Sequence, residues 1–203
     1  MNRYSNFHEL SQHEIRGTDY SIKTHSRPSH VVVVAPHGGG IEPGTSEIAS
    51  RVASEDLGMY LFEGMKATDN SKLHLTSTHF DEPECLRLVR AYRSVLTIHG
   101  CRSRSFAEEA VYVGGLHGEF RHLLTRHLEN SGFYVLDDNQ TKGISPANIC
   151  NKGTLGAGVQ IEISEGLRRR MFLTFSSCGG KRPLSTLDEF VCALRSAIHA
   201  LGR

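Results

Sequence analysis

The sequence lacks the features that would assign it to a membrane, secreted or nucleic-acid-binding class. The longest wholly apolar run, Val31–Ala35, is far too short to span a bilayer. The N-terminal segment 1–22 is polar and has no apolar core of signal-peptide length. The formal net charge is only +1, so charge alone indicates neither a nucleic acid nor a membrane as partner. We therefore expect the chain to be synthesised as a cytoplasmic protein.

Cysteine is also scarce, and its spacing indicates no metal or disulfide motif. The five cysteines are scattered, and no two have C-x-x-C spacing: Cys85, Cys101, Cys150, Cys178 and Cys192. An odd number of widely spaced cysteines is typical of reduced thiols in the cytosol and argues against a cysteine-rich zinc finger. Histidine is the abundant residue instead, with twelve in 203 positions, so we expect some of the histidines to be functional.

The remaining composition is that of one ordinary globular domain. Hydrophobic residues make up 38% and charged residues 22% of the 203 residues, a length that suits a full hydrophobic core. No repeat or linker divides the chain, so we expect one domain over 1–203, with 1–18 as a polar extension packed on it. Strand-like and helix-like stretches alternate, which predicts an α/β sandwich.

Apolar patterning gives the positions of the expected elements. The expected strands are Val31–Ala35, which is apolar throughout and should be central, Met59–Met65, Ser94–Gly100, Ala110–Gly115, Gly158–Ser164 and Arg170–Ser176. The expected helices run from Thr45 to about Leu57, from a cap at Asp81 to Val89, over Leu116–Ser131, and onward from a capping box at Thr186 and Glu189.

Three of these strands end with, or carry, a side chain suited to catalysis. His37 follows the first strand and is itself followed by three glycines and Glu42, while His99 ends the third strand. Alternation along the fifth strand places Glu162 on its polar face. Because ligands of open α/β sheets collect beyond the carboxyl ends of the strands, we expect these side chains to lie close together.

Two histidines and one carboxylate are the usual protein ligands of a catalytic zinc ion. The glycines would let the loop fold tightly enough for His37 and Glu42 to face the same ion as His99. Zinc lowers the pKa of a bound water to about 7, and a separate carboxylate must then take its proton, a general-base role that suits Glu162. Each residue also has a structural alternative: a hydrogen-bonded histidine, a glycine turn, or a glutamate paired with an arginine.

Five stretches of the sequence carry a family resemblance: APHGGGIEPGTSEIA, LHLTSTHFDEP, VLTIHGC, NICNKG and GVQIEIS. Together they resemble the poly-γ-glutamate hydrolase family of bacteriophages and their Bacillus prophage relatives, over about Asp19–Arg170. The resemblance implies a zinc-dependent hydrolase of carboxypeptidase A-like fold, a three-layer sandwich around a mixed, mostly parallel sheet. It implies one zinc ion per chain, with His37, Glu42 and His99 as ligands, and Glu162 as the catalytic carboxylate.

The implied substrate is poly-γ-glutamate, an anionic polymer whose γ-glutamyl amide bonds a metal-activated water would cleave. Cationic and amide side chains near the cleft are expected to bind its carboxylates: Arg102, Asn148, Asn151, Lys152 and Arg168. His74 and His79 are expected to line the cleft or to orient a metal ligand, and we assign the orienting role to His79.

Other functions stay open on the sequence alone. They are a zinc-dependent deacylase of small N-acyl amino acids, a hydrolase with Cys101 as its nucleophile, and a non-catalytic capsule-binding protein. We expect a monomer with neither a nucleic acid nor a membrane as partner. A phage-related enzyme made without an export signal would meet extracellular polymer after cell lysis.

Overall fold

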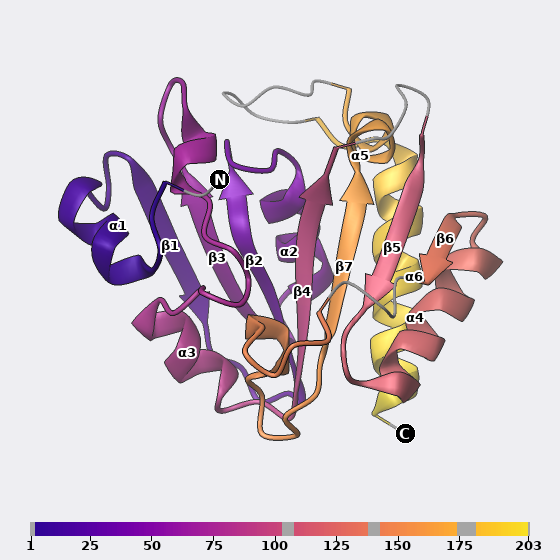
Figure 1. The fold of residues 1–203 in the computed structure, drawn as a ribbon. Helices are drawn as coiled ribbons and strands as arrows, with labels where there is room; N and C mark the ends of the chain where they lie inside the picture. The colour runs from indigo at the N-terminus through magenta and orange to yellow at the C-terminus, as the bar shows by residue number, and fades with distance from the viewer. Residues whose placement is uncertain (1–2, 103–107, 138–142, 174–181, 203) are drawn as a thin grey trace.

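A mixed sheet forms the centre of the molecule in the computed structural model, which describes residues 3–102, 108–137, 143–173 and 182–202 (Figure 1). Its strands are β1 (Tyr20–His25), β2 (Val31–Gly39), β3 (Gly58–Gly64), β4 (Ser94–Cys101), β5 (Ala110–Gly114), β6 (Tyr134–Asp137) and β7 (Val159–Ser164). The strand order is β1-β3-β2-β4-β7-β5-β6. Strands β2, β3, β4 and β7 run parallel to one another, whereas β1, β5 and β6 run in the opposite direction.

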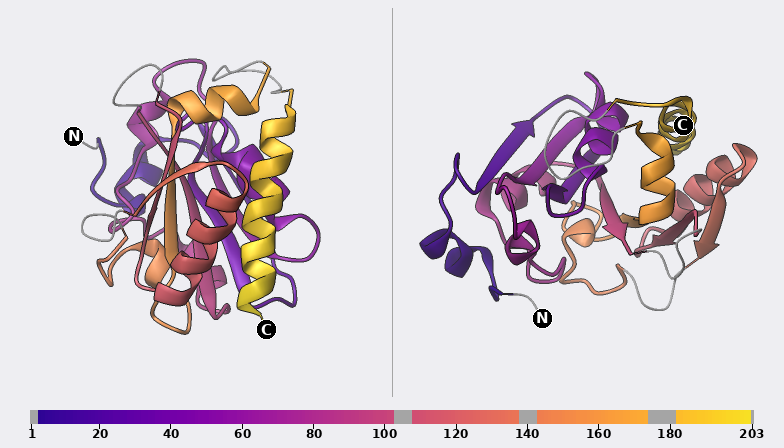
Figure 2. Two further views of the ribbon diagram at one scale, coloured as in Figure 1. Left: turned by 90° about the vertical axis from the view of Figure 1, so that its right-hand side faces the viewer. Right: turned by 90° about the horizontal axis from the view of Figure 1, so that it is seen from above.

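Helices cover both faces of this sheet (Figures 1 and 2). One face packs against α2 (Thr45–Ala53), α4 (Gly118–Asn130), α5 (Glu165–Met171) and α6 (Ser185–Leu201). The other face packs against α1 (Phe7–His13), α3 (Pro83–Val89) and two short 3-10 helices, η1 (Asn70–Leu73) and η2 (Ile149–Asn151). This arrangement confirms the predicted α/β sandwich around a mixed sheet.

The central strand β2 shows why its sequence is apolar throughout. Val31 and Val33 belong to the core cluster shared with α2, α4 and α6, while Val32 and Val34 belong to the cluster on the opposite face. All four are at most 3% exposed. Since successive side chains of a strand point to opposite faces, a strand covered on both faces needs apolar residues at every position.

The order of the connections creates a switch point between the carboxyl ends of β2 and β4. After β2 the chain passes through α2 to β3, which lies on one side of β2, whereas β4 lies on the other side. The chain thus continues from β2 to a strand on one side of it, and from β4 to β5, which lies on the other side beyond β7. Ligands of open α/β sheets bind at such a point, and it is where the candidate residues of β2 and β4 lie.

The predicted last strand, Arg170–Ser176, is wrong in its first part. Its first two residues belong to α5, which follows β7 directly, and its last three lie outside the described residues. Ser164 begins this helix, because its side chain accepts a hydrogen bond from the backbone N–H of Leu167. Leu167 and Met171 then enter the core four residues apart, which is a helical rather than a strand period.

Two helix starts also differ from the prediction. The side chain of Glu82, rather than that of Asp81, caps α3, and Asp81 instead accepts a hydrogen bond from the N–H of Phe7. Helix α6 begins without a side-chain cap, so the capping box predicted at Thr186 and Glu189 does not form. Asp81 thus links the N-terminal segment to the α3 layer.

The sequence patterns miss α1, β1 and β6, which lie at the margins of the fold. Both strands are at the edges of the sheet, where a mixture of exposed and buried residues hides the strand period. Tyr134 of β6, for example, is 63% exposed. Tyr4 and Leu10 of the N-terminal segment are buried in the cluster that contains Tyr20 and Phe62.

None of the helices in the described ranges is both long enough and apolar enough to cross a membrane.

Candidate metal centre

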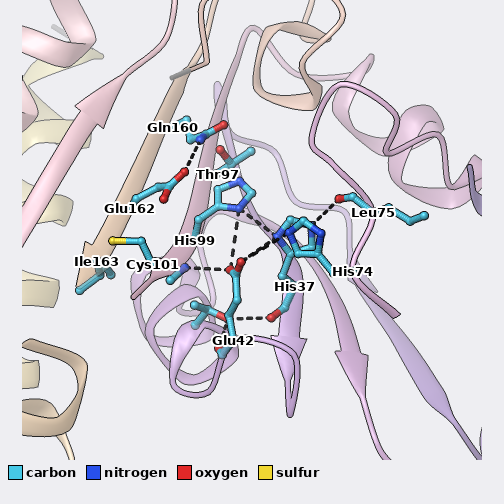
Figure 3. A network of polar contacts seen from close by, with 12 residues as sticks. His37, Glu42, His74, Leu75, Thr97, His99, Cys101, Gln160, Glu162 and Ile163 are labelled. Carbon is cyan, nitrogen blue, oxygen red and sulfur yellow. Dashed lines mark hydrogen bonds and ion pairs between the residues drawn. The ribbon is translucent and has the colours of Figure 1, made fainter. Parts of the chain in front are cut away.

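Three side chains from two strands and one loop meet at the switch point (Figure 3). His37 lies on β2, Glu42 in the loop that leads to α2, and His99 on β4. The Nδ1 atoms of His37 and His99 are 3.1 Å apart. The carboxylate of Glu42 lies 3.2 Å from Nδ1 of His37 and 3.9 Å from Nδ1 of His99. The structure thus brings together, within 4.8 Å, the three residues that the sequence singles out.

The glycine run in this loop is required by close packing and by backbone conformation. Gly39 has a φ of +61°, and a Cβ atom there would lie 2.4 Å from the carbonyl oxygen of Gly64 on β3. Only glycine adopts this conformation at such a distance without strain. The loop then folds back, because the N–H of Glu42 donates to the carbonyl of His37 at 2.9 Å.

Gly39→Ala is expected to destabilise the protein. The left-handed conformation alone costs a residue with a Cβ about 1–2 kcal/mol, and the contact with Gly64 adds to that cost. Chemical denaturation of the metal-free protein measures the effect. Gly118→Ala is the matched control, because a Cβ there meets nothing within 4 Å and the residue begins α4. Equal stability of the two variants would contradict this account of the loop.

Hydrogen bonds to the backbone fix which atoms of the cluster face one another. Nε2 of His37 lies 2.6 Å from the carbonyl oxygen of Leu75, which only accepts, so Nε2 carries a proton and Nδ1 is the ring nitrogen that faces Glu42 and His99. Oε2 of Glu42 accepts a hydrogen bond from the N–H of Gly100 at 2.8 Å. Outer contacts of this kind orient the ligands of metal sites, and sequence patterns miss them because a backbone group has no residue signature.

The three donors fit a tetrahedral zinc ion. Zinc–nitrogen and zinc–oxygen bonds of about 2.0–2.1 Å in a tetrahedron place the ligand atoms about 3.3 Å apart. The two Nδ1 atoms are 3.1 Å apart, Oε1 of Glu42 lies 3.2 Å from Nδ1 of His37, and Oε2 of Glu42 lies 3.9 Å from Nδ1 of His99, which are separations around that value. Two imidazole nitrogens that face each other at this distance need a shared proton or a metal cation between them, and the nearby carboxylate stabilises either positive charge.

Burial and charge oppose each other in this cluster. Burial raises the pKa of Glu42, but the imidazoles of His37 and His99 and the N–H of Gly100 outweigh it and hold that pKa at about 2. Burial lowers the pKa of His37, but the Glu42 carboxylate and the Leu75 carbonyl raise it above the usual value. Glu42 therefore stays ionised at neutral pH and supplies a negative charge for a cation.

Glu162 lies beside the cluster without being one of the three grouped side chains. It is in register with His99 on the neighbouring strand, and this register places both side chains on the same face of the sheet (Figure 3). Oε1 of the half-buried Glu162 accepts a hydrogen bond from Nε2 of Gln160 at 2.9 Å. The predicted alternation is confirmed, since the core cluster on the opposite face contains Val159, Ile161 and Ile163.

A further histidine, His74, packs against the cluster. Its ring centroid is 4.0 Å from that of His37, and its Nε2 lies 3.8 Å from the carboxylate of Glu42. Burial, together with the neighbouring His37, lowers the pKa of His74 to about 4, so the ring is neutral at neutral pH. The orienting role predicted for His79 is corrected, because His79 is exposed, on a turn in which its backbone N–H donates to the carbonyl of Thr76. The contact with the cluster comes from His74 instead.

Two asparagines that the sequence assigns to substrate binding are buried. Asn148 and Asn151 are each 4% exposed. Nδ2 of Asn148 donates to Oε1 of Gln160, and Nδ2 of Asn151 donates to the carbonyls of Gly143 and Ser145. Because these groups contact the protein itself, the structure gives both asparagines a bracing role rather than the predicted contact with substrate.

Arg168 is also corrected from a substrate contact to a brace. It is 4% exposed, and its guanidinium donates to the backbone carbonyls of Pro43, Cys101 and Ile163. These carbonyls belong to the loop that carries Glu42 and to the neighbouring strands β4 and β7. Arg168 therefore holds together the backbone segments that carry the cluster.

The other two predicted substrate contacts lie at different ends of β4. Arg102 is exposed and directly follows the end of the strand that carries His99. Lys152 is partly exposed and lies near the other end, where β4 begins. The next residue, Gly153, packs against the carbonyl of Arg93, which directly precedes the strand. Substrate binding by either residue stays a prediction.

Comparison with known proteins gives matches over most of the chain. The sequence model of the family described as poly-gamma-glutamate hydrolase matches residues 4–193. The chain is 43% identical to the UPF0714 protein YndL of Bacillus subtilis (strain 168) over 178 residues, which cover 85% of this chain and 68% of YndL.

Two solved structures are similar over nearly the whole length. A bacteriophage poly-gamma-glutamate hydrolase has a TM-score of 0.94 at 30% identity and covers 100% of this chain and 99% of its own. A zinc-free structure of YndL has a TM-score of 0.91 at 37% identity and covers 98% of both chains. Since the family match spans most of the sequence, and the fold agrees over the same length, the chain belongs to the poly-gamma-glutamate hydrolase family.

Proposed function

We propose that the protein hydrolyses the γ-glutamyl amide bonds of poly-γ-glutamate with one zinc ion held by His37, Glu42 and His99. Membership of the family supports hydrolysis of this polymer. The observation that carries the metal part is the meeting of two Nδ1 atoms and one carboxylate at the switch point of the sheet. The zinc-free structure of the similar protein YndL supports zinc as the ion.

The residues of the site then divide the chemical work. A zinc ion bound to the three donors would act as a Lewis acid toward the amide carbonyl and the attacking water. Glu162 takes a proton from that water as the water oxygen bonds to the carbonyl carbon. It passes the proton to the amide nitrogen as the carbon–nitrogen bond breaks. The products are a carboxyl group and an amine, and Glu162 returns to its ionised form.

The environment of Glu162 suits this task. It lies in register with His99, so its carboxylate and the metal-binding donors share one face of the sheet. It is half-buried, and thus a substrate or a water molecule has access to it. We propose Arg102 and Lys152 as contacts for the carboxylates of the polymer, because both are exposed or partly exposed cations.

Incubation of zinc-loaded protein with poly-γ-glutamate tests the proposal. Gel electrophoresis is expected to show shorter polymer, and an amine-reactive dye is expected to count one new amine for each bond cleaved. Hydrolysis of a small N-acyl amino acid with the polymer left intact would favour the deacylase and overturn the polymer assignment. Loss of activity on blocking Cys101 with a thiol reagent, and retention of activity with a chelator, would favour a cysteine nucleophile.

A further inference from the structure

Three hydrogen bonds form a relay from a backbone N–H to the carboxylate of Glu162. The N–H of Cys150 donates to Oδ1 of Asn148 at 3.0 Å. Nδ2 of Asn148 donates to Oε1 of Gln160 at 2.9 Å. Nε2 of Gln160 donates to Oε1 of Glu162 at 2.9 Å, as Figure 3 shows. Asn148 and Gln160 are 4% and 5% exposed, so neither amide is in open contact with solvent.

The chemistry of the groups fixes the direction of this relay. A backbone N–H only donates, so the amide oxygen of Asn148 must face Cys150 and its nitrogen must face Gln160. Gln160 must then turn its oxygen toward Asn148 and its nitrogen toward Glu162. The carboxylate at the end only accepts, and all three bonds are therefore mutually consistent. The orientation of Gln160 is thus set, through the side chain of Asn148, by the backbone N–H of Cys150.

We infer that Asn148 and Gln160 are positioning residues that hold the carboxylate of Glu162 in its catalytic orientation. This inference rests on the proposed role of Glu162 as general base. Proton transfer requires the base within hydrogen-bond reach of the water, and a freely rotating glutamate meets that requirement only part of the time. The amide of Gln160 holds one carboxylate oxygen and thereby sets the rotation of the group.

The position of Asn148 explains why a buried asparagine serves the site. Asn148 caps the short helix η2, on the segment that follows Gly143, far in sequence from His37 and His99. It reaches Glu162 only through Gln160, which lies two residues before Glu162 on the same face of β7. The polymer need not touch Asn148 for a substitution there to alter hydrolysis.

Asn148→Asp tests the relay at its most sensitive point. An ionised aspartate still accepts from the N–H of Cys150, but it has no donor for Gln160. Gln160 is then expected to reverse its amide, donate to the introduced carboxylate and turn its oxygen toward Glu162. Loss of a hydrogen bond to a charged group corresponds to about a 10- to 100-fold fall in kcat. KM and the zinc content are expected to stay close to those of the wild type.

Gln160→Met gives a second, independent test, since methionine is similar in length and donates no hydrogen bond. Its kcat is expected to fall to a similar extent. The double variant, with both substitutions, is expected to be no slower than Gln160→Met alone, because Asn148 acts only through Gln160. A merely structural role for Asn148 would instead give additive losses.

Asn151→Asp is the matched control. Asn151 is equally buried on the same turn, but its Nδ2 faces the carbonyls of Gly143 and Ser145. This variant is expected to lower thermal stability and to keep the wild-type kcat per folded, zinc-loaded molecule. Wild-type kcat in both Asn148→Asp and Gln160→Met, with Glu162→Gln inactive, would overturn the relay alone. Full activity of Glu162→Gln would overturn the proposed function itself.

Discussion

Replacing His99 with alanine is expected to remove zinc and hydrolysis together. His99 supplies one of the three grouped side chains of the site, and its Nδ1 lies 3.1 Å from that of His37. Its side chain is buried, with 3% exposed. Loss of an outer contact to a metal ligand lowers affinity about 10- to 100-fold, and loss of a ligand itself is expected to exceed that. Elemental analysis after dialysis measures the zinc, and the polymer assay measures the activity.

Two further variants make the result specific to coordination. His74→Ala removes a ring that packs 4.0 Å from the ring of His37 and that lies outside the grouped donors, so it is expected to retain stoichiometric zinc. His99→Gln keeps most of the side-chain volume, and circular dichroism separates zinc loss from unfolding in all three variants. Full zinc in both His99 variants would remove His99 from the ligand set, and zinc loss in His74→Ala would require a different set.

The elements that build the site are the ones that sequence patterns predict best. Strands β2, β4 and β7 are buried, so their apolar residues stand out, and the polar residues at their ends stand out by contrast. The edge strands β1 and β6 carry no such contrast. The helical start of α5 depends on the capping side chain of Ser164, a local hydrogen bond that competes successfully with the strand pattern of the following residues.

The sequence predicts the metal-binding side chains of the candidate site, because their residue types and the order of the strands are enough to bring them together. It does not predict the groups that orient them. Parallel strands bring His37 and His99 to one edge whatever the packing between them, because their strands are neighbours. The groups that orient these two histidines and the neighbouring loop depend on how distant segments pack together. The carbonyl of Leu75 has no residue signature, and Arg168 donates to backbone carbonyls of segments far away in the sequence. Asn148 is buried between the N–H of Cys150 and the side chain of Gln160. Which polar residue meets substrate, and which braces the loop, therefore depends on tertiary packing.

Glu162→Gln is expected to lower kcat by about 10²- to 10⁴-fold, the range that general acid–base catalysis contributes. Glutamine has the same shape, and its amide oxygen still accepts the hydrogen bond from Gln160, so the fold and the zinc content are expected to persist. An amide nitrogen takes the place of the second carboxylate oxygen, and it does not accept a proton at neutral pH. Initial-rate kinetics on poly-γ-glutamate measure kcat and KM separately.

Glu165→Gln is the matched control for this variant. Glu165 lies three residues later, in the first turn of α5, where it accepts two hydrogen bonds from the guanidinium of Arg169 at 2.6 and 2.9 Å. Its ion pair is exposed, so its loss is expected to change stability only slightly and kcat hardly at all. A large loss in Glu165→Gln with an active Glu162→Gln would move the general base to the helix. A loss confined to Glu162→Gln leaves the carboxylate in register with His99 as the group that moves the proton.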